Sequence, residues 1–192
     1  MTKQRPFLIG CLVVGALALP ALAGDPSEKY PGLNLIPWPK SLQLAQGHMK
    51  LDQNSRIVAA DPSLAPLADI LAGELQKATG LKLAVVSDAP RAGDIVLKIN
   101  KDIKADEPIR VIKDRQAAYT TDGAHTLTVG ERAVLEGFDY RAVAEGTATI
   151  LQAVSLQDGA VSLPRLTIKD WPHADYCGVM LERLNNARST SH

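Results

Sequence analysis

The sequence predicts an α+β fold, in which a largely antiparallel sheet carries two helices packed on one face. Two segments, residues 61–80 and 140–157, repeat apolar and small residues at helical spacing. Several short alternating or apolar runs surround them, and turn residues separate these runs as in hairpins. The chain of 192 residues suits one domain, or one domain with part of a second, because domains usually hold about 100–200 residues.

The first strands are expected after an extended leader at residues 25–34, which contains Pro and Gly. Residues 33–38 bring the chain into the fold. Pro37 and Pro39 keep this segment at a sheet edge, because neither can donate a ladder hydrogen bond. The expected elements that follow are a strand in which Leu42 and Leu44 alternate, a turn at Gln46-Gly47, and strands near residues 49–51 and 56–59.

The clearest helix is DPSLAPLADILAGELQKATG, residues 61–80. Asp61 or Ser63 is the expected cap at its start, and Gly80 ends it. Its apolar stripe consists of leucines three or four residues apart, Leu64, Leu67, Leu71 and Leu75.

The middle of the chain alternates between strands and turns. The expected elements are strands at residues 81–86 and 94–99 around a turn at 90–93, then a charged loop at 100–116 with one short strand near 109–112, then a hairpin with strands at 126–129 and 133–136 around a turn at 130–132.

The second helix is YRAVAEGTATILQAVSLQ, residues 140–157, whose small residues let it lie close on a sheet. A strand at residues 163–168 follows and is broken by Asp170-Trp171-Pro172. The next apolar run, residues 176–181, has the composition of the first buried strand of another domain.

The N-terminus has the three parts of a secretory signal peptide. Lys3 and Arg5 precede an almost wholly apolar run at residues 7–19, and Ala21-Leu22-Ala23 is the small-x-small pattern read by signal peptidase. The run is shorter than the about 20 residues of a transmembrane helix. We therefore expect cleavage after Ala23, export to the periplasm or secretion, and no membrane partner after cleavage.

Leu8-Ile9-Gly10-Cys11 also resembles a lipobox, in which Cys11 would be acylated. The apolar run continues well past Cys11, which favours an ordinary signal peptide but leaves lipidation open. If the leader is removed, Cys177 is the one cysteine left, so neither an intramolecular disulfide nor a cysteine zinc site can form.

Charge and motif content argue against several partners. Twenty-one Lys and Arg balance 21 Asp and Glu without a basic cluster, so a nucleic acid partner is not expected. His48, His125 and His173 lack metal-ligand spacing and are interpreted as surface or hairpin residues. No metal and no cofactor is therefore predicted.

Four segments in a fixed order resemble the N-terminal domain of the family 20 glycoside hydrolases, the β-N-acetylhexosaminidases. They are LIPWPKSLQL (35–44), HTLTVGERAVLEG (125–137), AEGTATILQAVSLQ (144–157) and LPRLTIKDWPHADYCGVMLE (163–182). The resemblance covers residues 33–182, although no single motif is diagnostic. In that family a (β/α)8 barrel follows, and the residues that match its first strand are Tyr176, Gly178, Met180 and Leu181.

The resemblance divides the chain into a signal peptide (1–23), a hexosaminidase-like α+β domain (24–172) and the start of a truncated barrel (173–192). It implies no catalytic and no substrate-binding residue here, because the family's substrate-assisted reaction uses an adjacent aspartate and glutamate on a later barrel strand. Asp106-Glu107 is instead interpreted as a solvated turn.

The expected first barrel strand also departs from the family pattern. Cys177 occupies the position of the family's sugar-binding arginine, and a thiol cannot make the forked hydrogen bonds of a guanidinium. Glu182 and Asn185 stand where the family has an aspartate and another arginine. Cys177 is interpreted as a packing residue, because no His or Asn/Asp constellation supports a cysteine nucleophile.

Two functions remain open. The first is a non-catalytic N-terminal domain, or a truncated fragment, of a secreted β-N-acetylhexosaminidase-like enzyme, inactive alone and partnered by a catalytic barrel absent from this chain. The second is a stand-alone glycan- or protein-binding module of the cell envelope, motivated by Trp38 and Trp171 as exposed platforms for sugars. The prolines flanking both tryptophans favour packing between domains instead. A frameshift origin of the final RLNNARSTSH is a third interpretation.

Overall fold

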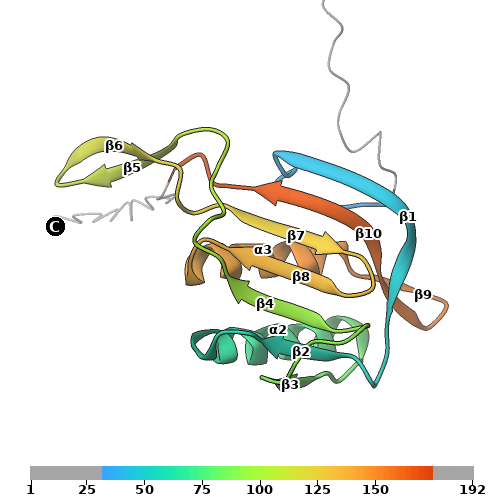
Figure 1. Ribbon diagram of the computed structural model, residues 1–192. Coiled ribbons are helices and arrows are strands. Elements are labelled where there is room, and N and C mark those ends of the chain that lie inside the picture. Colours follow the sequence, from blue (N-terminus) through green and yellow to red (C-terminus); the bar gives the residue numbers. More distant parts are fainter. Residues whose placement is uncertain (1–31, 175–192) are drawn as a thin grey trace, which may run out of the picture. The chain divides into compact units, whose positions relative to one another are not determined.

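The computed structural model describes residues 32–174, which form one large mixed sheet, two helices and a separate hairpin (Figure 1). The sheet runs in the order β1 (Ser41–Leu51), β10 (Ala160–Asp170), β7 (His125–Val129), β8 (Ala133–Gly137), β4 (Ile95–Ile99), β2 (Arg56–Ala59) and β3 (Ala84–Val86), and β9 (Ser155–Gln157) pairs with β10. Pairs from β1 to β8 are antiparallel, and pairs from β8 to β3 are parallel. The predicted α+β class is confirmed.

Both helices cover the same face of the sheet (Figure 1). The helix α2 (Ala65–Thr79) packs on β2 and β3, and α3 (Tyr140–Ala153) packs on β7 and β8. A 3-10 turn, η1 (Pro62–Leu64), leads into α2. The Asp61 carboxylate caps η1 by accepting a hydrogen bond from Ser63 N at 2.9 Å. The expected helices and their common face are therefore confirmed.

The main core lies between the sheet and the two helices. Its large, fully buried side chains come from both layers: Ile57, Leu64, Leu71, Leu75, Ile95, Leu97, Leu127, Leu135, Ile150, Leu163 and Leu166. The leucine stripe predicted for α2 is the part of this core that the helix supplies. Burial of such apolar area is the main favourable term in folding, about 25 cal/mol per Å².

The prediction of a turn at Gln46-Gly47 is wrong, because β1 continues through these residues as one strand. Its pairing with β10 shifts between Leu44 and His48, where residues 45–47 lie opposite Arg165 alone. The neighbouring Pro164, which pairs with His48, has no backbone N–H to give to the ladder, and the extra residues of β1 bulge beside it. Gly47 takes the positive φ of 88° in this bulge.

The second helix ends earlier than predicted. It stops at Ala153, and residues 155–157 form β9, which pairs with the start of β10. The connecting residues Asp158 and Gly159 have φ of 50° and 76°, as a two-residue hairpin turn requires. This hairpin also lengthens β10 beyond the predicted strand at 163–168.

The charged stretch predicted as a loop holds half of a hairpin. Its short strand is confirmed as β5 (Ile109–Lys113), which pairs with an unpredicted strand, β6 (Gln116–Thr120). Figure 1 shows this β5–β6 hairpin projecting beyond one end of the sheet. Its turn residues Asp114 and Arg115 have positive φ without being glycine, so the usual turn signal is absent.

A buried ion pair fixes the start of β4. Asp94 is 0% exposed and accepts from Arg56 Nη2 at 2.6 Å, from Arg56 Nε at 3.2 Å and from Arg91 N at 2.9 Å. Burial alone would raise the pKa of Asp94, but these hydrogen bonds and the two cations outweigh burial, so the pKa is lowered. The pair therefore ties β2, β4 and the turn before β4 together.

We predict that Asp94→Asn lowers the free energy of unfolding by about 3 kcal/mol, because it leaves Arg56 without its buried partner. A lowered carboxyl pKa stabilises above its unfolded value and loses this contribution as pH falls through the folded value. The variant should therefore show a flatter loss of stability below about pH 4. Urea unfolding at several pH values measures both effects.

The control is Asp88→Asn, which removes a 75% exposed carboxylate 3.6 Å from the same guanidinium. An exposed pair contributes about 0–1 kcal/mol, so this change should be small. Equal losses for the two variants would contradict the structural role assigned to Asp94.

Two glycines let α3 lie unusually close to the sheet. A Cβ on Gly146 would lie 2.3 Å from Leu135 Cδ1 and 3.0 Å from His125 Cδ2, and a Cβ on Gly137 would lie 2.5 Å from Val143 N. Leu135 is fully buried and has no free space to move into.

Gly146→Ala should therefore destabilise the fold by about 1–3 kcal/mol through overpacking. Gly73→Ala in α2 is the matched control, since its new Cβ meets nothing within 4 Å. That change should stabilise by about 0.5–1 kcal/mol, because alanine favours a helix. Thermal or urea unfolding of both variants measures these changes in the free energy of unfolding. If Gly146→Ala stabilised the fold, the close approach of α3 to the sheet would be refuted.

Candidate functional site

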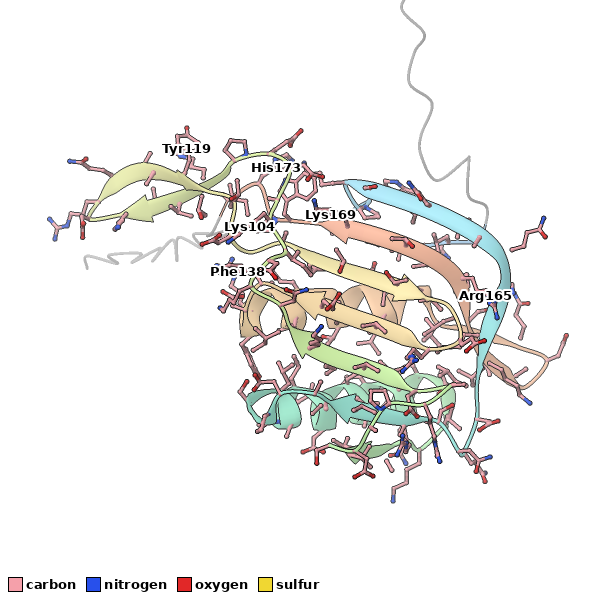
Figure 2. The ribbon with its side chains drawn as sticks, viewed as in Figure 1. Lys104, Tyr119, Phe138, Arg165, Lys169 and His173 are labelled. Atoms are coloured by element: carbon pink, nitrogen blue, oxygen red, sulfur yellow. The ribbon has the colours of Figure 1, made fainter. Side chains whose placement is uncertain are left out.

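The two ends of the described chain meet at one edge of the domain. We call residues 32–40 the incoming segment and residues 170–174 the outgoing segment. Asp170 Oδ1 accepts from Lys40 N at 3.2 Å and from Trp171 N at 2.9 Å, and Lys40 Nζ donates to His173 Nε2 at 2.7 Å. Figure 2 shows His173 and Lys169 at the end of the sheet next to the β5–β6 hairpin. Asp170 therefore holds both segments together.

Gln152 attaches the incoming segment to α3. Ile36 N donates to Gln152 Oε1 at 2.7 Å, and Gln152 Nε2 donates to Ile36 O at 2.9 Å. This reciprocal pair satisfies both backbone groups of Ile36, although its side chain is 79% exposed.

A cavity of about 490 Å³ lies among these groups, and we call it the α3 pocket. It is bounded by residues 35–40, residues 170–173 and the side of α3, and its remaining lining residues are His125, Glu145, Ala148, Thr149 and Gln152. Small-molecule and side-chain sites in proteins are usually such mostly apolar clefts of about 300–1,000 Å³ with a few polar groups.

His125 forms part of the wall of the α3 pocket. It is 3% exposed, and neither ring nitrogen has a hydrogen-bond partner in the described part of the chain. Burial lowers the pKa of the imidazole from its usual 6.5, and the charge of Asp170 opposes this only in part. The interpretation of this residue as a surface histidine is wrong, whereas its hairpin position is confirmed and His48 and His173 are exposed.

Two carboxylates line the same pocket. Burial raises the pKa of Glu145, and the guanidinium of Arg141, 3.0 Å away, opposes this shift. Asp170 accepts only from backbone N–H groups, and no ion pair is formed by it among residues 32–174. The structure thus brings together His125, Glu145 and Asp170, which the sequence interpretation did not combine.

The sequence-based candidates lie elsewhere. Asp106 and Glu107 are confirmed as an exposed turn, where Asp106 pairs with Lys169 and Glu107 lies 4.0 Å from Lys40 Nζ. Cys177, Glu182 and Asn185 lie outside the described residues, as do Cys11 and the expected signal peptide.

The two tryptophans differ in environment. Trp171 is only 7% exposed and packs with Ala105, Ile109 and Ala124, so the interpretation of two exposed tryptophans is wrong for it. Trp38 is partly buried at the α3 pocket. Replacing Trp171 with alanine would therefore test folding rather than glycan binding.

Residues 32–174 contain no group of three or more His, Cys, Asp or Glu placed to hold a metal ion. Neither α2 nor α3 is long and apolar enough to span a bilayer, and no other described helix is.

The family model for glycosyl hydrolase family 20, domain 2, matches residues 32–171, and the chain belongs to this family. The N,N'-diacetylchitobiase of Vibrio harveyi is 30% identical over 95 residues, which are 47% of this chain and 11% of that protein.

Solved structures share the fold. The chitobiase of Flavobacterium johnsoniae aligns with a TM-score of 0.58 and 19% identity, over 78% of this chain and 22% of that one. The family 20 β-N-acetylhexosaminidase of Streptomyces coelicolor A3(2) aligns with a TM-score of 0.52 and 21% identity, over 69% and 25%. The chain therefore spans about a quarter or less of these relatives' lengths.

We predict that His125 makes stability depend on pH near neutrality. Its folded pKa is lowered, so the unfolded state binds the proton first, and stability should fall as pH drops below about 6.5, by at most about 1.4 kcal/mol per pH unit. His125→Leu should remove this slope while changing stability at pH 7.5 by less than about 1 kcal/mol, because it replaces an unpaired polar group with an apolar one of similar size.

The control is His48→Gln on exposed β1, which should keep the slope of the parent chain. Chemical unfolding between pH 5 and 7.5 gives the comparison. An unchanged slope in His125→Leu would show that His125 is not the titrating group.

Proposed function

We propose that this chain is the exported, non-catalytic N-terminal domain of a β-N-acetylhexosaminidase-type glycoside hydrolase, and that it acts by docking against a catalytic domain. The observation that carries this proposal is the family match across residues 32–171, nearly all of the described chain. In the solved relatives the part that aligns with this chain makes up only 18–25% of the whole chain.

The described acids support a non-catalytic role. Family 20 chemistry requires an aspartate and an adjacent glutamate held at a sugar. The one adjacent Asp-Glu pair among residues 32–174 is Asp106-Glu107, whose side chains are 63% and 65% exposed and paired with lysines. Glu145 and Asp170 lie in the α3 pocket but come from different elements and have separate partners.

The arrangement of the chain ends supports docking. The incoming and outgoing segments are joined through Lys40 and Asp170, so a domain that continues after residue 174 would begin at the rim of the α3 pocket. The exposed Ile36 and the partly exposed Trp38 at this edge are apolar groups that such a domain would cover.

The purified chain should release no measurable chromophore from a chromogenic N-acetylglucosaminide, because residues 32–174 hold no adjacent aspartate and glutamate placed in a pocket for substrate-assisted hydrolysis. A family 20 hexosaminidase in the same assay provides the positive control. Turnover that the chain itself carries out would refute the non-catalytic role.

A double variant, Glu145→Gln with Asp170→Asn, identifies the source of any turnover. Loss of the activity in this variant would place catalysis in the α3 pocket. Its persistence would indicate a contaminating hydrolase, and the proposal would stand.

A further inference from the structure

We propose that the α3 pocket is a binding site for one cationic side chain, a lysine or an arginine, contributed by the catalytic domain. The identity of the occupant rests on the proposed function, whereas the preference for a cation rests on the groups of the pocket itself.

Among the ion pairs that residues 32–174 form around the pocket, none includes the carboxylate of Asp170. Glu145 pairs with Arg141 at 3.0 Å, Lys40 lies 4.0 Å from Glu107, and Lys169 pairs with Asp106. Asp170, at the pocket wall, has only the backbone donors of Lys40 and Trp171. A partly buried carboxylate without a cation is costly, and an incoming ammonium or guanidinium would offset this cost.

His125 cannot supply the missing positive charge. Its ring is buried, and burial lowers the pKa of the imidazole, which favours the neutral form. Both ring nitrogens also lack partners in the described chain, and a buried polar group without a partner in a pocket wall indicates a ligand or partner that is not present. This observation is independent of the carboxylates and points to the same cavity.

The remaining walls suit the stem and head of a long cationic side chain. Trp38 and Trp171 line the pocket, and cations are attracted to aromatic faces within about 6 Å. Lys169 Nζ already lies 5.9 Å from the Trp171 ring centroid. The apolar lining residues Leu35, Pro37 and Ala148 can pack against the methylene groups of the same side chain.

The position of the pocket favours a protein side chain over a free small molecule. The segments through which the chain enters and leaves the domain form two of its walls. In the solved relatives about three quarters or more of the chain lies outside the matched part. The outgoing segment thus lines the pocket up to His173, next to Ala174, which bridges to Arg110 of β5.

The test uses argininamide as the cationic probe and citrullinamide, in which a neutral urea replaces the guanidinium, as the control. The chain contains only two tryptophans, so the indole N–H signals of Trp38 and Trp171 report on the pocket in ¹⁵N-labelled full chain. We expect saturable shifts of these signals with argininamide and at least about 10-fold weaker binding of citrullinamide. Equal binding of the two probes, or no saturable shift, would overturn the proposal.

Asp170→Asn locates the charge that matters. The amide Oδ1 can still accept from Lys40 N and Trp171 N, so the joint between the segments is kept while the charge is lost. Argininamide binding should weaken about 10-fold. Asp106→Asn, which removes a nearby exposed carboxylate, should leave it unchanged. Wild-type affinity in Asp170→Asn would contradict the proposal, and if this variant does not fold, the comparison of the two probes on the parent chain still decides.

Titration with glucosamine distinguishes between two natural occupants of the pocket, a free amino sugar and a protein side chain. If the pocket binds glucosamine more than about 10-fold more tightly than it binds argininamide, the natural occupant is a small ligand. That result would overturn the proposal of a side-chain binding site. Failure of the cation test leaves the domain assignment intact, because that assignment is decided by the turnover assay.

Discussion

The close contact between α3 and the sheet is the constraint on which the site depends. Gly137 and Gly146 remove the side chains that would separate the helix from β7 and β8. At this distance Gln152 reaches the backbone of Ile36, and His125 is covered by the helix. The end of β10 then completes the pocket with Asp170, which holds the incoming and outgoing segments together. A helix farther from the sheet would leave this edge open.

Residue spacing within a short segment was enough to predict the elements whose boundaries depend only on neighbouring residues. The leucine spacing and Gly80 were sufficient to predict α2, although Asp61 caps the 3-10 turn η1 and α2 itself begins at Ala65. The alternation of residues 126–129 was sufficient to predict β7. β9 was missed because its short sequence continues the composition of α3, although Asp158-Gly159 is a recognisable hairpin turn. β6 was missed because its turn has no glycine.

The pocket residues show what sequence patterns omit. The alternation that places Leu127 and Val129 inside would also have placed His125 inside, if it had been extended by one residue. Glu145 and Asp170 carry no comparable signal, because they are 25 residues apart and meet only through the packing of α3 against β10. Convergence of polar groups from distant elements is a property of the tertiary fold.

The pocket is a place where the domain alone is incompletely satisfied. Within residues 32–174 the imidazole of His125 has no hydrogen-bond partner and the carboxylate of Asp170 has no cation, and folded proteins usually keep such groups where they serve a function. A cationic side chain in the pocket would resolve the charge deficit and link the domain to its enzyme. The most direct measurement is a crystal structure of the chain with argininamide. The account predicts guanidinium density about 3 Å from the Asp170 carboxylate, between Trp38 and Trp171, and an empty pocket with the ligand bound elsewhere would contradict it.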